Sequence, residues 1–318
     1  MRIAWIVGKR LITLVVTLFV TALIVFLSLH LVPGDTAALL LRGREATPGA
    51  LAAVTKEFGL DRPLPVQFLD WLGGVLRLDL GTSFQFRIPV TTLILSRMPA
   101  TIILVGYAMV LIVLIGVSLG VAASLRYGKR ADRVILFVTQ AFSAVPSFVA
   151  SVILVSLVAV KLGWFPVYGF GTDPLDILRH MTLPAVSLAV VYIALLARVT
   201  RDAMVDQAQR EHVDVARSRG IPPWIVVRRH IFRNALGPIS TVSGLVVAGL
   251  IVGGAIVETI FGLSGIGSLL VTSVNSNDIP VVQGITLLIA ATYVVVNTLV
   301  DIAQTVIDPR IAAGAAAR

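Results

Sequence analysis

Long apolar stretches, rather than alternating polar and apolar positions, dominate this chain. Six of them approach or exceed the roughly 20 helical residues needed to cross the hydrocarbon core of a bilayer, with allowance for tilt and interruption. They run over residues 11–31, 100–125, 134–160, 181–197, 239–261 and 280–300. The pattern predicts an all-α, polytopic membrane protein with six transmembrane helices. Lys9 and Arg10 before an apolar run resemble the start of a signal peptide. The run is too long for a signal peptide, however, and no A-x-A cleavage site follows, so we expect a retained helix.

The overall composition agrees with this interpretation. Hydrophobic residues make up 57% of the chain and charged residues only 14%, whereas a soluble protein is about half apolar. The net charge of +9 does not indicate nucleic acid as a partner, because the basic residues fall between apolar stretches rather than on one face. The chain has no cysteine, and its four histidines are scattered, so we expect neither a metal site nor a cofactor.

The positions of lysine and arginine predict the orientation in the membrane. Seventeen of them lie at the two ends of the chain or in the connections after the second and fourth stretches, whereas the connections after the third and fifth hold only Lys161 and Arg179. Basic residues favour the cytoplasmic side, so both termini and residues 198–238 are expected there. Residues 33–98 are then extracytoplasmic, and their seven basic residues are no conflict because loops of more than about 60 residues cross largely regardless of charge.

The chain therefore divides into residues 1–32 with the first helix, the extracytoplasmic segment 33–98, and a five-helix core over 99–318. Within 33–98, "TPGALAAVTKEFGL", "VQFLDWLGGVLRL" and "VTTLILSRMPA" have helical periodicity and are separated by breakers. We expect short helices at the outer surface, which either cover the helix bundle or dock a soluble partner.

Glycines and prolines inside the apolar stretches predict how the helices meet. The pairs Gly116/Gly120 and Gly249/Gly253 place small residues on one helical face, where another backbone can approach closely. Pro146 and Pro184 are expected to interrupt the third and fourth helices.

The predicted cytoplasmic segment carries the motif "DVARSRGIPPWIVVRRHIFRNALGP", which begins at Asp214. An amphipathic helix is expected from Asp202 to Arg219, ended by Gly220 in a left-handed conformation. Pro222 and Pro223 suit the first turn of a second helix. A flexible tether would be rich in glycine and serine. The sequence instead predicts a stiff elbow able to transmit a push from a soluble partner.

This elbow resembles the EAA loop, E-A-A-x3-G-x9-I-x-L-P, of permeases in binding-protein-dependent ABC importers. Asp214, Val215 and Ala216 stand for E-A-A, and Gly220 follows at the required spacing. His230 and Arg233 replace the isoleucine and proline of the motif. Further stretches are similar to the dipeptide, oligopeptide and nickel branch of that family, in the order "LVPGD", "FGLDRPLPVQFLDWL", "DLGTSF", "RMPATI", "VPSF", "KLGWFP", "ETIFGLSGIGSLL", "NDIPVVQG" and "DPRI".

The resemblance implies a type I ABC importer permease (MetI-like) fold with an extracytoplasmic helical insertion, in a bacterial plasma membrane. Two homologous permease subunits would form the translocation path for peptides, two cytoplasmic ATPases would dock on the EAA loops, and an extracytoplasmic binding protein would deliver the substrate. By the same resemblance, Asp214, Ala216 and Gly220 belong to the ATPase-coupling helix. Arg217 and Arg219 flank that helix and are available to pair with acidic groups of the ATPase.

The chain itself lacks the motifs of two enzyme classes. "GLSGIGS" at 262–268 has no lysine of a phosphate-binding loop, so ATP hydrolysis is expected in separate subunits. Gly262 to Gly265 match the G-x-S-G of rhomboid proteases, but no histidine follows His230 to serve as the base.

Glu258 is an ionisable residue near the predicted outer end of the fifth helix, which makes it a candidate for the substrate path, although structural hydrogen bonding is the competing interpretation. Three alternative functions remain open at this point: a permease for nickel or another small solute, an ion-coupled secondary transporter, and a membrane enzyme or scaffold.

Overall fold

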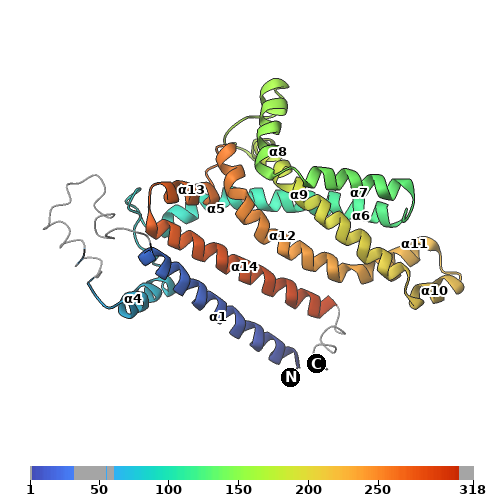
Figure 1. The fold of residues 1–318 in the computed structure, drawn as a ribbon, viewed down its shortest axis with the longest axis horizontal. Coiled ribbons are helices and arrows are strands. Elements are labelled where there is room, and N and C mark those ends of the chain that lie inside the picture. Colours follow the sequence, from blue (N-terminus) through green and yellow to red (C-terminus); the bar gives the residue numbers. More distant parts are fainter. Residues whose placement is uncertain (1, 32–54, 56–60, 308–318) are drawn as a thin grey trace. The chain divides into compact units, whose positions relative to one another are not determined.

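The computed structural model describes residues 2–31, 55 and 61–307, and this part of the chain is almost entirely helical. Figure 1 shows its helices, coloured along the sequence. The internal contacts divide the chain into two compact units. Unit 1 comprises Met1–Pro99 with Ser268–Val294, and unit 2 comprises Ala100–Gly267 with Val295–Arg318. Helices α5, α13 and α14 each contribute residues to both units.

Unit 1 contains the helices at the beginning of the chain and parts of three later ones. They are α1 (Arg2–Leu31), α4 (Leu64–Leu76), the first turns of α5 (Val90–Leu111), most of α13 (Ile266–Asn275) and the first part of α14 (Ile279–Ile307). Phe68 of α4 is buried and meets Phe19 and Phe26 of α1 edge to ring, with centroids 5.7 and 5.4 Å apart. These aromatic contacts fix α4 against α1.

The extracytoplasmic helices predicted from the sequence have three outcomes. The helix predicted within "VQFLDWLGGVLRL" is confirmed as α4. The segment "TPGALAAVTKEFGL" lies outside the described residues except for Thr55. The prediction of a separate surface helix at "VTTLILSRMPA" is wrong, because these residues are the first turns of α5, which accommodates Pro99 without a break.

A buried carboxylate joins two distant segments of unit 1. Asp278, which is fully buried, precedes α14 and accepts hydrogen bonds from the Ser83 hydroxyl and from the backbone amides of Phe84 and Gln85, the last two at 3.0 and 3.2 Å. The Ser83 hydroxyl in turn accepts from the Phe86 amide at 2.9 Å. The sequence stretches "DLGTSF" and "NDIPVVQG" therefore form one structure, the Asp278 clamp.

Replacing Asp278 with alanine is expected to loosen this clamp strongly. Three donors would lose a charged acceptor in a buried place, which costs about 3 kcal/mol of unfolding free energy. Hydrogen exchange at the amides of Phe84 and Gln85 should rise with it. Asp70→Ala is the matched control, since its carboxylate is exposed and pairs with exposed Arg62. Unchanged protection of the two amides in Asp278→Ala would contradict the clamp.

Unit 2 is built around α9 (Pro174–Ala208), which packs on α6, α7, α8 and α12. Its other elements are the remainder of α5, η1 (Ile112–Gly116), α6 (Val117–Ser124), α7 (Arg130–Ser143), α8 (Ser147–Leu154), η2 (Val155–Lys161), α10 (Glu211–Ser218), α11 (Pro223–Ile225), η3 (Val226–Phe232), α12 (Arg233–Ile260), the first two residues of α13 and the last part of α14. The three η segments are π-helical turns within longer helical runs.

The predicted close approach of a neighbouring backbone is confirmed at Gly116 and Gly120, whereas Gly249 and Gly253 meet side chains instead. A Cβ atom on Gly120 would lie 2.5 Å from the Ala197 carbonyl oxygen, and one on Gly249 would lie 2.4 Å from the Tyr192 hydroxyl. Both partners belong to α9, so α6 and α12 contact this central helix through glycine.

The apolar helices agree with four of the predicted spans and refine two. Val90–Ser124, Pro174–Ala208, Pro223–Ile260 and Ile279–Val300 are each long and apolar enough to cross a membrane. The third predicted span consists of α7 and α8–η2, bent by 88° at a short break. Pro146 lies at this break as the N-cap of α8, which confirms the predicted interruption there. The predicted interruption at Pro184 is wrong, because Pro184 is buried inside the continuous helix α9. The first predicted span lies within α1 (Arg2–Leu31), of which the stretch Ile12–Leu27 is apolar.

Candidate coupling site

The elbow predicted from the sequence lies at one end of unit 2, where α9 gives way to α10 (Figure 1). The prediction of a single helix from Asp202 to Arg219 is wrong. Residues 202–208 end α9, the backbone becomes extended at Arg210 (φ −83°, ψ 143°), and α10 begins at Glu211. The change of direction allows Val213 and Ala216 of α10 to be buried in the core of unit 2.

Gly220 forms the corner of the elbow in the conformation that was predicted. Its φ is +71°, in the left-handed region. The Gly220 amide donates to the Arg217 carbonyl at 2.9 Å, and the Ile221 amide donates to the Ala216 carbonyl at 3.3 Å. These two bonds are the Schellman pattern that ends a helix and satisfies its last carbonyls.

The second arm of the elbow continues without a break into a predicted membrane span. Pro223 occupies the first turn of α11, as its sequence position predicts. From there α11, η3 and α12 form one helical run, Pro223–Ile260, of 38 residues. A displacement of the corner therefore acts directly on a long apolar helix rather than on a linker.

The two arms are attached to each other by packing and by polar contacts. Val213 and Ala216 of α10 belong to the same buried cluster as Val226 and Ile231 of η3. At the surface, His212 Nε2 lies 3.2 Å from the His230 carbonyl oxygen, and the Asn234 side-chain amide donates to that same oxygen at 2.7 Å. The elbow is consequently a braced structure, in agreement with the predicted stiffness.

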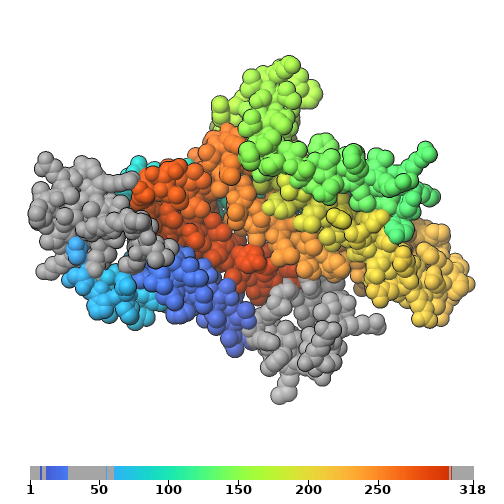
Figure 2. Space-filling model, in the orientation of Figure 1, coloured from blue at the N-terminus to red at the C-terminus, as the bar shows by residue number. Residues whose placement is uncertain are grey.

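The residues singled out from the sequence occupy different positions on this elbow. Asp214, Arg217, Arg219 and Gly220 are exposed, whereas Ala216 is buried. Arg217 lies 3.5 Å from Asp214, an exposed pair that contributes little to stability. Four of these five residues are thus accessible to a partner protein, and the fifth, Ala216, packs α10 against the core of unit 2. In the space-filling view, α10 and α11 form the yellow and orange surface at this end of unit 2 (Figure 2).

A buried ion pair, which the sequence patterns did not reveal, lies at the base of the elbow. Arg201 of α9 donates to both oxygens of Asp132 of α7, at 3.0 and 2.8 Å, and its guanidinium lies 4.9 Å from the centroid of the Tyr127 ring. Asp132 is 2% exposed and also accepts from the Gly128 amide. The available signal was an acidic residue within the basic stretch "KRADR" beside an apolar run. This pair ties the α6–α7 turn to the end of α9 that carries the elbow.

Glu258 lies in a different part of unit 2, at the end of α12 away from the elbow. It is 1% exposed and accepts a hydrogen bond from the Thr101 hydroxyl at 2.6 Å. Thr101 Oγ1 in turn accepts from the Ile266 amide at 2.8 Å, and a Cβ atom on Gly265 would lie 2.3 Å from the Glu258 carboxyl carbon. We call these residues the Glu258 clamp. In this conformation the Glu258 carboxyl group is hydrogen-bonded within the protein, and its role in the substrate path stays a prediction.

The helical architecture and the elbow define a class: a multi-pass inner-membrane component of a transport system. The chain belongs to the family of binding-protein-dependent transport system inner membrane components, whose model matches residues 112–313. The model of the N-terminal part of such membrane components matches residues 3–105.

Curated relatives cover nearly the whole chain. This chain is 38% identical over 308 residues to a probable peptide ABC transporter permease protein of Sinorhizobium fredii. The aligned region covers 95% of this chain and 97% of the relative. The chain is 37% identical over 303 residues to a glutathione transport system permease protein of Salmonella choleraesuis, with the same coverage. Among solved structures, a chain of the inward-facing MetNI methionine ABC transporter matches with a TM-score of 0.52 and 17% identity, over 70% of this chain and 95% of that one. This last match concerns the fold, and it confirms the predicted MetI-like permease fold.

Proposed function

We propose that this chain is the transmembrane permease subunit of an ATP-driven importer and forms half of the translocation path for peptides. The assignment of peptides as the substrate class rests on the 38% identity, along nearly the full length, to a probable peptide ABC transporter permease. A glutathione permease at 37% identity agrees with it, since glutathione is itself a short peptide.

The proposal assigns energy coupling to the elbow. One cytoplasmic ATPase would seat against α10 and the Gly220 corner on each of two permease subunits. Exposed Asp214, Arg217 and Arg219 would offer charged contacts, and buried Ala216 would hold α10 on the core. The support for this role is the continuity of the second arm with the span Pro223–Ile260, because movement of the corner then reaches the membrane segment.

The proposed orientation places both chain termini and the elbow in the cytoplasm, and the Glu258 clamp near the outer face. Its support is electrostatic: the α6–α7 turn and the elbow lie at the same end of unit 2 (Figure 1), and both carry clusters of arginine and lysine. Such clusters favour the cytoplasmic side. An extracytoplasmic binding protein would then deliver the peptide from the opposite side.

Reconstitution in liposomes tests this function. The chain, its companion permease and their ATPases are expected to take up a labelled peptide only when ATP is enclosed and the binding protein is added outside. Nickel and an amino acid serve as competing cargo in parallel samples. Uptake by the chain alone, driven by an ion gradient, would overturn the proposal in favour of a secondary transporter. ATP-dependent uptake of nickel but not of peptide would overturn the substrate class while leaving the importer assignment intact.

A further inference from the structure

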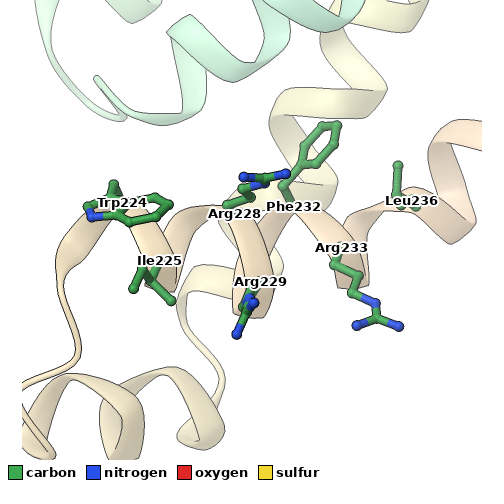
Figure 3. Close-up of a pocket in the computed structure, with 7 residues that line it drawn as sticks. All are labelled: Trp224, Ile225, Arg228, Arg229, Phe232, Arg233 and Leu236. Carbon is green, nitrogen blue, oxygen red and sulfur yellow. The ribbon is translucent and has the colours of Figure 1, made fainter.

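A basic trough runs along the outward face of the elbow's second arm. It has a volume of about 520 Å³ and is lined by Trp224, Ile225, Arg228, Arg229, Phe232, Arg233 and Leu236. Figure 3 shows two rows of side chains, with Trp224, Arg228 and Phe232 on one side and Ile225, Arg229 and Arg233 on the other. We call this feature the arginine trough.

The local helix geometry produces these rows. Residues 226–232 form the π-helical turn η3. Side chains four positions apart along a helical run are neighbours on its surface, which places Trp224, Arg228 and Phe232 in one row and Ile225, Arg229 and Arg233 in the other. Val226, Ile231 and Ala235 of the same run are buried in the core of unit 2. Phe232 packs against this core, whereas Trp224, Arg228, Arg229 and Arg233 are exposed, so a ligand has access to their side chains.

The charge of the trough is not balanced by the protein. Its lining contains three arginines and no acidic residue. In the part of the chain that the structure describes, Arg228, Arg229 and Arg233 form no ion pair, whereas Arg201 and Arg210 pair with nearby aspartates. Clustered, unpaired guanidinium groups attract an anion, and their planar donors match the oxygens of a phosphate.

An apolar groove continues from one end of the trough. Leu236 lines both, and the groove, of about 370 Å³, extends along α12 between Met109, Ile239, Ser240, Ser243, Gly244, Val247, Val296 and Val300. A basic site followed by an apolar groove matches the two ends of a phospholipid, whose phosphate is charged and whose acyl chain is not.

The position of the trough along the helix also suits a lipid. The arginines occupy the first turns of the 38-residue run Pro223–Ile260, and no charged residue follows Arg233 in this run before Glu258. Tryptophan is favoured at the boundary between membrane and water, and Trp224, near the start of this run, is 64% exposed. Basic clusters at such boundaries attract anionic headgroups.

From these observations we infer that the arginine trough binds the phosphate headgroup of an anionic phospholipid, with an acyl chain in the adjoining groove. Arg229 and Arg233, which lie on the same side of the helix (Figure 3), hold the phosphate, and Arg228 adds positive charge from the other row. Leu236, which lines both cavities, packs against the glycerol region, and Ile239 and Val247 contact the chain. The inference requires that α12 crosses the membrane, and it does not depend on which substrate the transporter carries.

The test uses the complete transporter, purified in a mild detergent and incubated with equal amounts of phosphatidylglycerol and phosphatidylcholine with identical acyl chains. Native mass spectrometry then measures which lipid stays bound. We expect the wild type to retain phosphatidylglycerol over phosphatidylcholine by about tenfold or more, given the attraction of three arginines for an anionic headgroup. The triple variant Arg228→Gln, Arg229→Gln and Arg233→Gln should lose this preference.

Two further variants make the result specific. The control Arg126→Gln, Lys129→Gln and Arg130→Gln removes the same charge from the exposed α6–α7 turn and should keep the lipid preference. Ser243→Phe fills the apolar groove and should lower retention of the lipid without reducing binding of glycerol phosphate. Assembly with the ATPases is recorded for every variant, so that misfolding is recognised.

Three results would overturn the inference. Retention of phosphatidylglycerol by the trough variant at the wild-type level would show that the arginines hold no lipid. Complete displacement of phosphatidylglycerol by glycerol phosphate, together with an unchanged Ser243→Phe variant, would indicate a site for a soluble anion. Loss of the ATPases from the trough variant with lipid still bound would instead make this face a protein-docking surface.

Discussion

Gly220→Val is expected to leave the protein inserted in the membrane while uptake falls about tenfold, since holding a β-branched residue in the left-handed region costs about 1–2 kcal/mol or more. A Cβ atom at this position would meet nothing within 4 Å, so the substitution acts through the backbone alone. The corner should relax toward negative φ and redirect α11 relative to α10. ATP hydrolysis by the assembled transporter should continue without matching uptake.

Gly220→Asn is the matched control, because asparagine tolerates the left-handed region far better than valine. Both variants are measured in proteoliposomes for uptake and for ATP hydrolysis stimulated by the binding protein. Near-normal uptake by the asparagine variant beside poor uptake by the valine variant would support a requirement for this backbone conformation. Full uptake by Gly220→Val would count decisively against coupling through the corner.

Glu258→Ala is expected to produce the second large effect, a loss of about 2–3 kcal/mol of unfolding free energy, because a buried charged acceptor for the Thr101 hydroxyl disappears. Thermal unfolding of the detergent-solubilised protein would show the loss. If Glu258 belongs to the clamp, the effects of Glu258→Ala and Thr101→Val should not add, since both remove the same hydrogen bond.

The double-mutant cycle also separates the clamp from a role in the substrate path. A substrate contact at Glu258 would raise the apparent KM for peptide while leaving the unfolding temperature near the wild type, and Thr101→Val would not reproduce it. A clamp lowers the unfolding temperature in both single variants. Fully additive losses in the double variant would exclude the Glu258–Thr101 interaction as the source of the stability.

The sequence predicted where apolar helices occur better than where helices end. An apolar stretch shows which residues suit lipid, but a helix can extend beyond it into polar residues. Helix α9, for example, begins at Pro174, seven residues before the apolar stretch 181–197 from which it was predicted. The signal for that start was nonetheless present, because Asp173 caps the helix and proline occupies its first turn. The end of α9 had no such signal, since neither glycine nor proline stands at Gln209 or Arg210. Burial of Val213 and Ala216 sets that turn, and burial depends on the tertiary structure.

The elbow was predicted more completely than the contacts that surround it. Gly220 and the two prolines are local signals, and their conformations follow from the residues themselves. The Asp132–Arg201 pair and the clamps at Asp278 and Glu258 join residues that are 69, 195 and 157 positions apart. Helical periodicity carries no information about such pairs. The motifs that contain them could be recognised as a resemblance, but their pairing became evident only in three dimensions.

The unbroken run from Pro223 to Ile260 has a mechanical consequence for alternating access. At about 1.5 Å per residue, its 38 residues place the Gly220 corner and the Glu258 clamp more than about 50 Å apart along one axis. Tilting this helix about its midpoint would move its two tips in opposite directions. A single rocking motion could therefore open the path at one face while narrowing it at the other, without any separate signal passing through the bilayer.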